Sequence, residues 1–308
     1  MKTVVVGDAI IDQISRPGEA GLVRQPGGGA LNVAVGLTLL GRAATLIYLE
    51  GLDPAGRVIQ RHLNQHGVKF ISLPSGQPTG IATAVSQDRP DGPAYSFNQA
   101  MTARRYRFDS RAHQAIQRAG AVTLTAFPFE DPRSVAGFIK AAGATGGLRL
   151  IDPNPRPALI ADRQLYLDGL LAAAAISDLV KLSLEDLHFL SDGQGGLLEQ
   201  IKRRCRTVLV TQGPAGAVVH LPDGGTWHSP AAALRRPVAD TLGAGDAVLA
   251  AIVSELELRH SLADQNWWSR VLPKAMEVAA WTCRGQGGLL RLPPKWGQPA
   301  ITNQQEAL

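Results

Sequence analysis

Short apolar runs rich in valine, isoleucine and leucine alternate along this chain with longer segments in which apolar residues recur every three or four positions. The short runs predict strands and the longer segments predict helices. The predicted strands cover residues 3–6, 44–49, 121–125, 148–151, 179–182 and 208–211. The predicted helices between them cover residues 30–40, 54–66, 110–119, 132–142, 163–175 and 197–204. This alternation predicts a three-layer α/β/α fold with a mostly parallel central sheet.

The pattern changes after residue 211. Two short apolar runs, 217–221 and 226–228, flank a turn-forming Pro-Asp-Gly-Gly stretch and predict a hairpin. The apolar spacing then predicts helices at about 245–258 and 271–283.

One earlier region also interrupts the alternation of strands and helices. Residues 70–97 contain two segments of alternating polarity, 81–86 and 94–97, which are separated by turns rich in proline and glycine. No helix is expected between them. This pattern predicts a small antiparallel sheet inserted in the α/β body, where it would act as a lid at the edge of a cleft.

The composition is that of a compact globular protein. Of 308 residues, 45% are hydrophobic and 19% are charged, and only 2 are cysteines. These values exclude a disordered protein and a disulfide scaffold. We expect one domain over residues 1–308, with lid segments at about 13–26 and 70–100 inserted in it.

No segment of the sequence is apolar over a length that would span a membrane. The longest uninterrupted apolar stretch, 170–176, is far shorter than the roughly 18 residues that a spanning helix needs. At the start of the chain, the apolar run 3–6 ends at Gly7 and Asp8, which is too short for a secretory signal. We therefore expect a cytoplasmic protein without a membrane partner.

The chain is mildly basic, with 31 Lys and Arg against 26 Asp and Glu and a net charge of +5. The basic residues are mostly arginines scattered along the sequence, and 5 Trp, 4 Tyr and 7 Phe are too few for a base-stacking platform. We therefore expect no nucleic-acid partner. A mildly cationic cleft for an anionic small molecule such as a nucleotide fits this charge better.

The strongest local motif runs from Asp240 to Asp246 and reads Asp-Thr-Leu-Gly-Ala-Gly-Asp. Glycines just before a helix leave its first backbone N–H groups open to an anion, which the helix dipole also attracts. Asp246 would lie in the first turn of that helix. A carboxylate beside a phosphate-binding turn is placed to accept the proton of an attacking hydroxyl.

A second glycine cluster, Gly27 to Gly29, opens the helix that carries Asn32. It lacks the G-x-G-x-x-G spacing of a dinucleotide site, and the chain contains no G-x-x-x-x-G-K-[ST] motif, so an NAD-dependent oxidoreductase is set aside. Asp12 and the segment 152–156 follow other predicted strands. Open α/β sheets bind ligands at the carboxyl ends of their strands, so we expect these polar groups to share one site.

In their order and spacing these motifs resemble those of the ribokinase-like, or phosphofructokinase B, family of carbohydrate kinases, from about residue 3 to 293. The matching motifs are Gly7 to Asp12, Gly28-Gly29 with Asn32, Leu40-Gly41, Gly51-x-Asp53-x-x-Gly56, Asp152-x-Asn154-x-Arg156, Thr211-x-Gly213-x-x-Gly216 and Asp240 to Asp246. Within the family the chain is most similar to the fructokinase branch, which also carries Pro-Thr-Gly before a lid strand, here residues 78–80.

The resemblance implies a ribokinase-like fold and a role for each matching position. Residues implied to contact the sugar are Asp12, Gly28, Asn32 and Asn154. Residues implied to line the ATP site are Lys181, Thr211, Gly213 and Gly216. Residues implied in catalysis are Asp246 as the general base, Gly243, Ala244 and Gly245 as the anion hole, and Arg156 beside the γ-phosphate.

The resemblance also implies cations. Family members use Mg²⁺ with ATP and often bind a monovalent cation such as K⁺ near the loop that begins at Asp240. Where the family has Asn-x-x-Glu, which acts on Mg²⁺ through water, this chain reads Ser-Leu-Glu-Asp at residues 183–186. Asp186 is one methylene shorter than Glu, so we expect the metal-supporting role at Asp186 or at Glu185.

These observations predict an ATP-dependent kinase that phosphorylates a primary hydroxyl of a small sugar, with fructose or a related ketose as the leading acceptor. One alternative is a nucleoside or aminoimidazole riboside kinase, in which Phe97 or Met101 would contact the base. A non-catalytic sugar-binding protein on the same fold is an alternative of another class. Arg104 and Arg105 are expected to be surface charges, although as a clamp they would suit an acidic sugar such as ketodeoxygluconate.

The predicted lid also bears on the oligomeric state. An exposed strand edge with alternating apolar residues invites pairing, and two lids that pair would satisfy each other's backbone groups in a closed two-fold contact. We therefore expect a homodimer formed through the lid.

Overall fold

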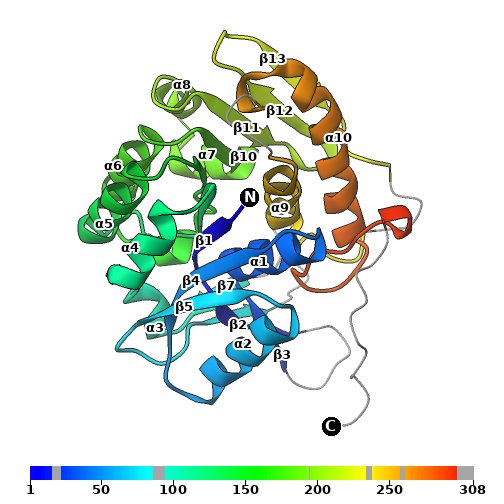
Figure 1. Ribbon diagram of the computed structural model, residues 1–308. Coiled ribbons are helices and arrows are strands. Elements are labelled where there is room, and N and C mark those ends of the chain that lie inside the picture. Colours follow the sequence, from blue (N-terminus) through cyan, green and yellow to red (C-terminus); the bar gives the residue numbers. More distant parts are fainter. Residues whose placement is uncertain (16–21, 86–93, 194, 234–237, 257–260, 297–308) are drawn as a thin grey trace.

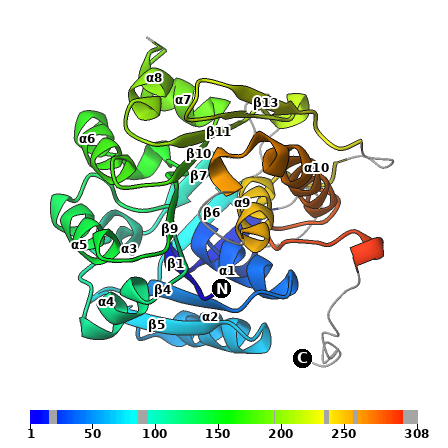
Figure 2. The ribbon, with the colours of Figure 1, turned by 45° about the horizontal axis from the view of Figure 1, so that its top comes forward.

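The computed structural model describes residues 1–15, 22–85, 94–193, 195–233, 238–256 and 261–296. Among these residues, a central sheet of nine strands lies between two layers of helices (Figures 1 and 2). Its order is β13-β12-β11-β10-β9-β8-β1-β4-β5, and the seven strands from β11 to β5 are parallel. These strands are β1 (Thr3–Gly7), β4 (Ala44–Glu50), β5 (Lys69–Pro74), β8 (Ala121–Thr125), β9 (Leu148–Asp152), β10 (Leu179–Ser183), β11 (Thr207–Thr211), β12 (Ala217–His220) and β13 (Thr226–Ser229). The predicted three-layer fold is confirmed.

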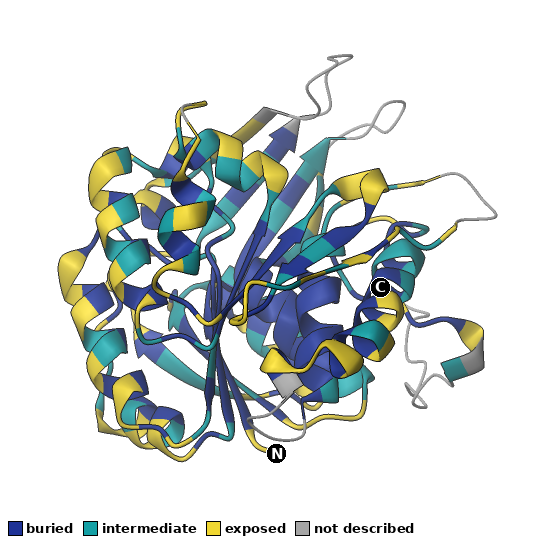
Figure 3. Ribbon diagram, turned by 90° about the horizontal axis from the view of Figure 1, so that it is seen from above, coloured by how far each residue is buried: buried dark blue, intermediate teal, exposed yellow. Residues whose placement is uncertain are grey.

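Each face of the central sheet has its own hydrophobic core, because consecutive side chains of a strand point to opposite faces. Val5 belongs to one core, and its neighbours Val4 and Val6 belong to the other. The helices on the side of Val5 are α1 (Gly29–Leu39), α2 (Pro54–Gln65), α9 (Ala244–Glu255) and α10 (Gln265–Thr282). Those on the other side are α4 (Ser110–Gln117), α5 (Pro132–Gly143), α6 (Arg163–Ala174), α7 (Leu184–Leu190) and α8 (Leu197–Lys202). The central strands are buried between these layers (Figure 3).

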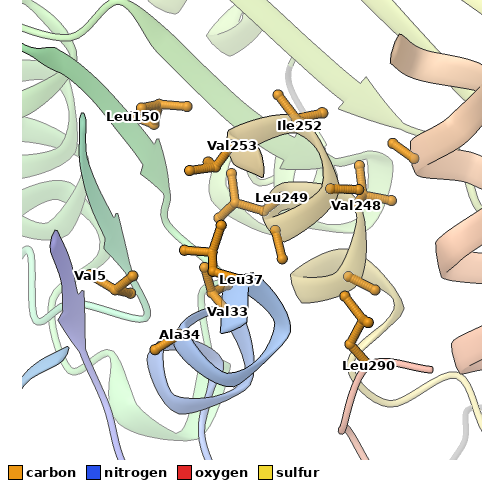
Figure 4. Close-up of a cluster of buried hydrophobic side chains, with 14 of the residues drawn as sticks. Val5, Val33, Ala34, Leu37, Leu150, Val248, Leu249, Ile252, Val253 and Leu290 are labelled. Atoms are coloured by element: carbon orange, nitrogen blue, oxygen red, sulfur yellow. The ribbon is translucent and has the colours of Figure 1, made fainter. Parts of the chain in front are cut away.

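Helices α1 and α9 pack against each other inside the first core. Figure 4 shows Val33 and Leu37 of α1 beside Leu249 and Val253 of α9. All four side chains are buried with at most 2% of their surface exposed. This packing fixes the first turn of α1 relative to the first turn of α9.

The helices differ in how their first turns are capped. Five longer helices are capped by an aspartate whose carboxylate accepts a backbone N–H of the first turn. These caps are Asp53, Asp109, Asp131, Asp162 and Asp264. In contrast, α1 and α9 begin after Gly28 and Gly243, and no side chain caps them. Backbone carbonyls accept some of their first N–H groups, as Asp8 does for Leu31 and Thr241 for Ala244, so each of these helix starts is only partly open to another acceptor.

A separate sheet of four strands has the order β3-β2-β6-β7. Its strands are β2 (Ile10–Ser15), β3 (Leu22–Gly27), β6 (Ile81–Val85) and β7 (Ala94–Phe97). A small antiparallel sheet was predicted, and β3 with β2 and β6 with β7 are antiparallel, but β2 and β6 pair in parallel. No strand was predicted in the lid segment 13–26. Its described part instead forms β2 and β3, whose mixed polar and apolar residues hide the strand signal, and residues 16–21 and 86–93 lie outside the described residues.

Residues 70–74 correct a second expectation, which placed them in the inserted sheet. They belong to β5, which pairs in parallel with β4 and forms one edge of the central sheet. The physical reason is the connection: α2 ends just before β5, so β4, α2 and β5 complete one strand-helix-strand unit. The short α3 (Gln99–Thr102) then follows the small sheet. None of the helices described is both long and apolar enough to cross a membrane.

We expect Leu249→Ala to destabilise the protein by about 2–5 kcal/mol, because it removes a fully buried side chain between α1 and α9 and leaves a cavity. The free energy of unfolding in urea measures the effect. Leu52→Ala is the matched control, since Leu52 is 89% exposed and should change that free energy by less than about 0.5 kcal/mol. Equal losses in the two variants would contradict the packing described for α9.

Candidate active site

A cavity of about 840 Å³ opens beyond the carboxyl ends of the parallel strands and is lined by residues of both sheets. Every residue that was given a role from the sequence lines it. These residues are Asp12, Gly28, Asn32, Asn154, Arg156, Lys181, Glu185, Asp186, Thr211, Gly213, Gly216, Asp240, Gly243, Ala244, Gly245 and Asp246. The position agrees with the rule that open α/β sheets bind ligands at this edge.

The start of α9 forms one wall of the cavity. Gly243 precedes the helix in the left-handed region at φ 77°, and a methyl group in its place would lie 2.1 Å from the carbonyl oxygen of Gly288. Only glycine fits there. The N–H of Ala244 donates to the carbonyl of Thr241 at 3.2 Å, whereas the N–H of Gly245 has no acceptor among the described residues. This turn therefore offers a partly open anion site at the positive end of a helix dipole.

Asp246 lies in the first turn of α9 and is 7% exposed. One of its carboxylate oxygens, Oδ2, accepts a hydrogen bond of 2.9 Å from Nδ2 of Asn32 on α1. The other oxygen has no hydrogen-bond donor in the described part of the chain. Asp246 can therefore receive a proton on Oδ1 while Asn32 holds it in position.

The free oxygen of Asp246 faces other polar atoms across Gly29. A methyl group on Gly29 would lie 3.1 Å from Oγ1 of Thr125, 3.2 Å from Nδ2 of Asn154 and 3.3 Å from Oδ1 of Asp246. The hydroxyl of Thr125 is fully buried without a hydrogen-bond partner among the described residues. Gly29 thus leaves open the space on which three polar side chains converge.

Charges around Asp246 act on its pKa in opposite directions. Burial raises the pKa, and the hydrogen bond from Asn32 and the charges of Lys181 and Arg156 oppose that rise. The net pKa lies above the ordinary value of an aspartate. A carboxylate with a raised pKa is a better proton acceptor than one that is fully solvated.

Lys181 brings a positive charge to the start of α9. Its Nζ donates to Oδ2 of Asp152 at 2.6 Å, and both side chains are almost fully buried. Burial lowers the pKa of Lys181, but the neighbouring carboxylates of Asp152 and Asp186 outweigh it and keep the pKa above its usual value. A methyl group on Gly245 would lie 3.1 Å from this Nζ, so the ammonium group lies beside the open turn.

Asp12 and Arg156 lie in the same cavity. Burial raises the pKa of Asp12 to about 6, the charge of Arg156 lowers it, and the charges of Asp246 and Asp240 raise it. The guanidinium of Arg156 lies 5.9 Å from the ring centre of Tyr95 on β7. Neither Asp12 nor Arg156 is tied to an ion pair within the chain segments described, so both are available to a ligand.

The other end of the cavity contains Thr211 and two carboxylates. Oγ1 of Thr211 donates to the carbonyl of Leu182 at 3.3 Å. Asp186 forms a capping box with Ser183: its Oδ2 accepts the Ser183 N–H at 2.8 Å, and its own N–H donates to Oγ of Ser183 at 3.0 Å. In the described part of the chain, the other oxygen of Asp186 and the carboxylate of Glu185 have no hydrogen-bond donor, so both remain for a cation.

Asp240 joins two loops beside α9. Its Oδ1 accepts the N–H of Leu242 at 2.9 Å, and its Oδ2 accepts the N–H of Gly287 at 3.0 Å. Asp240 therefore holds the loop before α9 against the loop that contains Gly288, which is the residue in contact with Gly243.

Arg104 was expected on the surface, and this expectation is wrong. Its side chain is only 11% exposed, lines the cavity and forms an ion pair with Asp8, whereas the side chain of Arg105 is 49% exposed, as predicted. The spacing of polar residues could not reveal this, because Asp8 and Arg104 are separated by most of the first hundred residues. The two residues meet only when the fold brings the end of β1 and the segment after α3 together.

Comparisons with known proteins agree with this geometry. Residues 1–293 match the family model described as pfkB family carbohydrate kinase. A fructokinase of Klebsiella pneumoniae is 34% identical over 276 residues, covering 85% of this chain and 86% of that protein. A fructokinase with bound ATP from Xylella fastidiosa has a similar structure, with a TM-score of 0.78 and 21% identity over 93% of each chain. An aminoimidazole riboside kinase from Salmonella enterica, complexed with aminoimidazole riboside and an ATP analog, has a TM-score of 0.75 and 21% identity over 96% of this chain and 98% of that one.

The pKa of Asp12 generates a prediction about stability. With a pKa of about 6 in the folded protein against an ordinary value of 3.8, Asp12 binds its proton more tightly when the protein is folded. Its contribution to the free energy of unfolding is therefore present below about pH 4 and is lost as the pH rises through about 6. We expect the wild type to lose up to about 3 kcal/mol relative to Asp12→Asn over this window.

Urea unfolding of both proteins at several pH values between about 4 and 7 measures this difference. Wild-type and Asp12→Asn profiles that run parallel across the window would show that Asp12 does not carry the raised pKa.

Proposed function

The chain belongs to the pfkB family of carbohydrate kinases, and from this premise we propose that it transfers the γ-phosphoryl group of ATP to a primary hydroxyl of fructose or a closely related ketose. The observation that carries the proposal is Oδ1 of buried Asp246, which has no hydrogen-bond donor among the described residues and lies at the start of α9, where no side chain caps the helix. A proton acceptor and an anion site in the same helical turn are what phosphoryl transfer to a hydroxyl requires. The fructokinase of K. pneumoniae supports fructose as the acceptor.

Asp246 acts as the general base in this proposal. Its Oδ1 accepts the proton of the sugar hydroxyl as the hydroxyl oxygen attacks the γ-phosphorus, and the bond from that phosphorus to the β-γ bridging oxygen of ATP breaks. The hydrogen bond from Asn32 keeps Oδ1 turned toward the hydroxyl. Asp12, Asn32 and Asn154, together with the backbone at Gly28, bind the sugar.

The charge that develops on the phosphoryl group is stabilised by the positive end of α9. The turn Gly243, Ala244 and Gly245 supplies the helix dipole and an open N–H, and Lys181 and Arg156 supply full positive charges in the same cavity. Electrostatic stabilisation of this kind is the largest catalytic contribution in phosphoryl transfer. In this proposal Lys181 and the turn of Thr211, Gly213 and Gly216 also line the ATP site.

Mg²⁺ fits the carboxylates at the ATP end of the cavity. Glu185 and the free oxygen of Asp186 are hard ligands of the kind that Mg²⁺ prefers. No group of three or more His, Cys, Asp or Glu side chains within the described residues is arranged to hold a metal by itself. This suits an ion held largely by the phosphates of ATP, and when bound it would neutralise their charge. We also keep the loop at Asp240 as the place for a monovalent cation such as K⁺.

A riboside kinase is the second candidate. The S. enterica aminoimidazole riboside kinase shares the fold, and Phe97 and Met101 line the cavity of this chain as apolar side chains that a base could contact. A screen of ATP consumption with fructose, tagatose derivatives, ribose, ketodeoxygluconate and ribosides separates the candidates. We expect the highest kcat/KM with fructose, and a riboside with a higher kcat/KM than fructose would replace it as the acceptor.

The requirement for ATP favours the cytoplasm as the place of action.

We expect Asp246→Asn to lower kcat by roughly 100-fold or more, because the amide cannot accept the proton of the sugar hydroxyl. Binding of fructose and of ATP, measured by calorimetry, should be retained. Asp168→Asn makes the same chemical change on the exposed face of α6 and is the matched control. A kcat of Asp246→Asn within about threefold of the control would remove Asp246 from the mechanism.

We also propose that two copies of the protein pair through their four-stranded sheets. Leu22 on β3 and Tyr95 on β7 support this, since both are large apolar side chains exposed at 47% and 39% on opposite edges of that sheet. Sedimentation at tens of micromolar should show a dimer, and Leu22→Asp should shift it toward monomer. Leu165→Asp, at an exposed site on α6, should leave it unchanged. A wild type that is strictly monomeric with and without sugar would contradict the pairing.

A further inference from the structure

Arg104 and Asp8 form a buried ion pair in the wall of the cavity, and the proposed transfer step leaves this pair without a role. Nη1 of Arg104 donates to Oδ2 of Asp8 and, at 2.9 Å, to the carbonyl of Ala126. Nε of Arg104 donates to the carbonyl of Met101 at 2.8 Å. The hydroxyl of Tyr106 lies 3.4 Å from the other oxygen of Asp8. The guanidinium is thus held by acceptors from three separate segments.

The pair still has capacity to bind a ligand. A guanidinium has five N–H groups, and those on Nη2 of Arg104 have no acceptor among the residues that the structure describes. Asp8 lies beside it as an acceptor, and both residues line the cavity. A donor next to an acceptor matches a sugar hydroxyl, which accepts one hydrogen bond and donates another.

The balance of charge around the pair bears on the kind of sugar. The cavity lining includes eight carboxylate residues, among them Asp8, Asp12 and Asp246, against three cations, which are Lys181, Arg104 and Arg156. The positive charge of Arg104 is already matched by Asp8 in direct contact. A ligand carboxylate placed at Arg104 would therefore also face Asp8, and two like charges in a buried site repel strongly.

We propose that the Asp8–Arg104 pair determines acceptor specificity by binding a hydroxyl of a neutral sugar and rejecting a sugar acid. The inference rests on the proposed function, because it concerns the acceptor of the same site. Asp8 is the element that makes the difference, since it cancels the charge that would otherwise attract a carboxylate. Without the negative charge of Asp8, the same guanidinium becomes a clamp for an acid.

The test compares kcat/KM for fructose and for ketodeoxygluconate in the wild type, Asp8→Asn and Arg104→Gln. Asp8→Asn should lower the ratio of kcat/KM for fructose to kcat/KM for ketodeoxygluconate by about tenfold or more. Arg104→Gln should lower kcat/KM for fructose by about tenfold or more, the usual cost of an unpaired hydroxyl, without improving the acid. The KM for ATP should stay unchanged in both variants.

Arg105→Gln is the matched control, because Arg105 is adjacent in sequence, exposed and outside the cavity lining. It should leave both kcat/KM values as in the wild type. The proposal would be overturned if the ratio of the two kcat/KM values in Asp8→Asn stayed within about threefold of the wild-type ratio. It would also be overturned if Arg104→Gln kept the wild-type kcat/KM for fructose. If circular dichroism shows that Asp8→Asn does not fold, Arg104→Lys replaces it in the test. Lysine keeps the positive charge but lacks the planar guanidinium, so kcat/KM for fructose should again fall by about tenfold.

Binding separates this proposal from the proposed function. If the wild type phosphorylates neither sugar, the kinase assignment to these acceptors fails, but calorimetry with the same two sugars still tests the pair. The wild type should then bind fructose with a lower Kd than ketodeoxygluconate. Asp8→Asn or Arg104→Gln should reduce the difference between these two Kd values. An unchanged difference between the two Kd values in both variants contradicts the role of the pair.

Discussion

The hydrogen bond from Asn32 to Asp246 joins the first turns of α1 and α9, and the arrangement of the site depends on it. These two helices pack against each other along buried faces, so their starts cannot shift independently (Figure 4). Both starts follow a glycine and lack the aspartate cap that five other helices carry. The fold therefore places two helix N-termini without side-chain caps at one cavity and fixes one carboxylate between them. That carboxylate keeps a free oxygen because Asn32 engages only the other one.

Burial sets the chemistry of the charged groups in this cavity. A buried charge is tolerated when it is paired, and Lys181 with Asp152 and Arg104 with Asp8 are such pairs. Among the described residues Asp246 forms no ion pair, and its burial raises its pKa. The paired charges hold the shape and electrostatic balance of the cavity. The carboxylate of Asp246 remains for proton transfer. The ion pairs therefore serve binding, and the carboxylate of Asp246 serves the reaction.

Much of this could be predicted from the sequence, because short apolar runs and glycine turns are local signals. Apolar runs predict the strand 121–125 and the hairpin of 217–220 and 226–229. The glycines before Asp246 predict its place at the start of a helix. The strands β2 and β3 could not be predicted, since they are defined by pairing with each other and with β6 rather than by an apolar run. The start of α10 at Gln265 was also missed, because polar residues of its first turn follow the cap Asp264. Arg104 was misplaced for a related reason: its partner Asp8 lies just after β1, far from Arg104 in the sequence.

The central claim is that Asp246 faces the attacking hydroxyl while the start of α9 receives the phosphoryl group. The structure of the protein with fructose and a non-hydrolysable ATP analogue tests it most directly. The account predicts a primary hydroxyl of the sugar within hydrogen-bond distance of Oδ1 of Asp246, with the γ-phosphate group at the N–H groups of the turn 243–245. A sugar bound in the same cavity with every primary hydroxyl away from Asp246, or a γ-phosphate bound away from that turn, would contradict it.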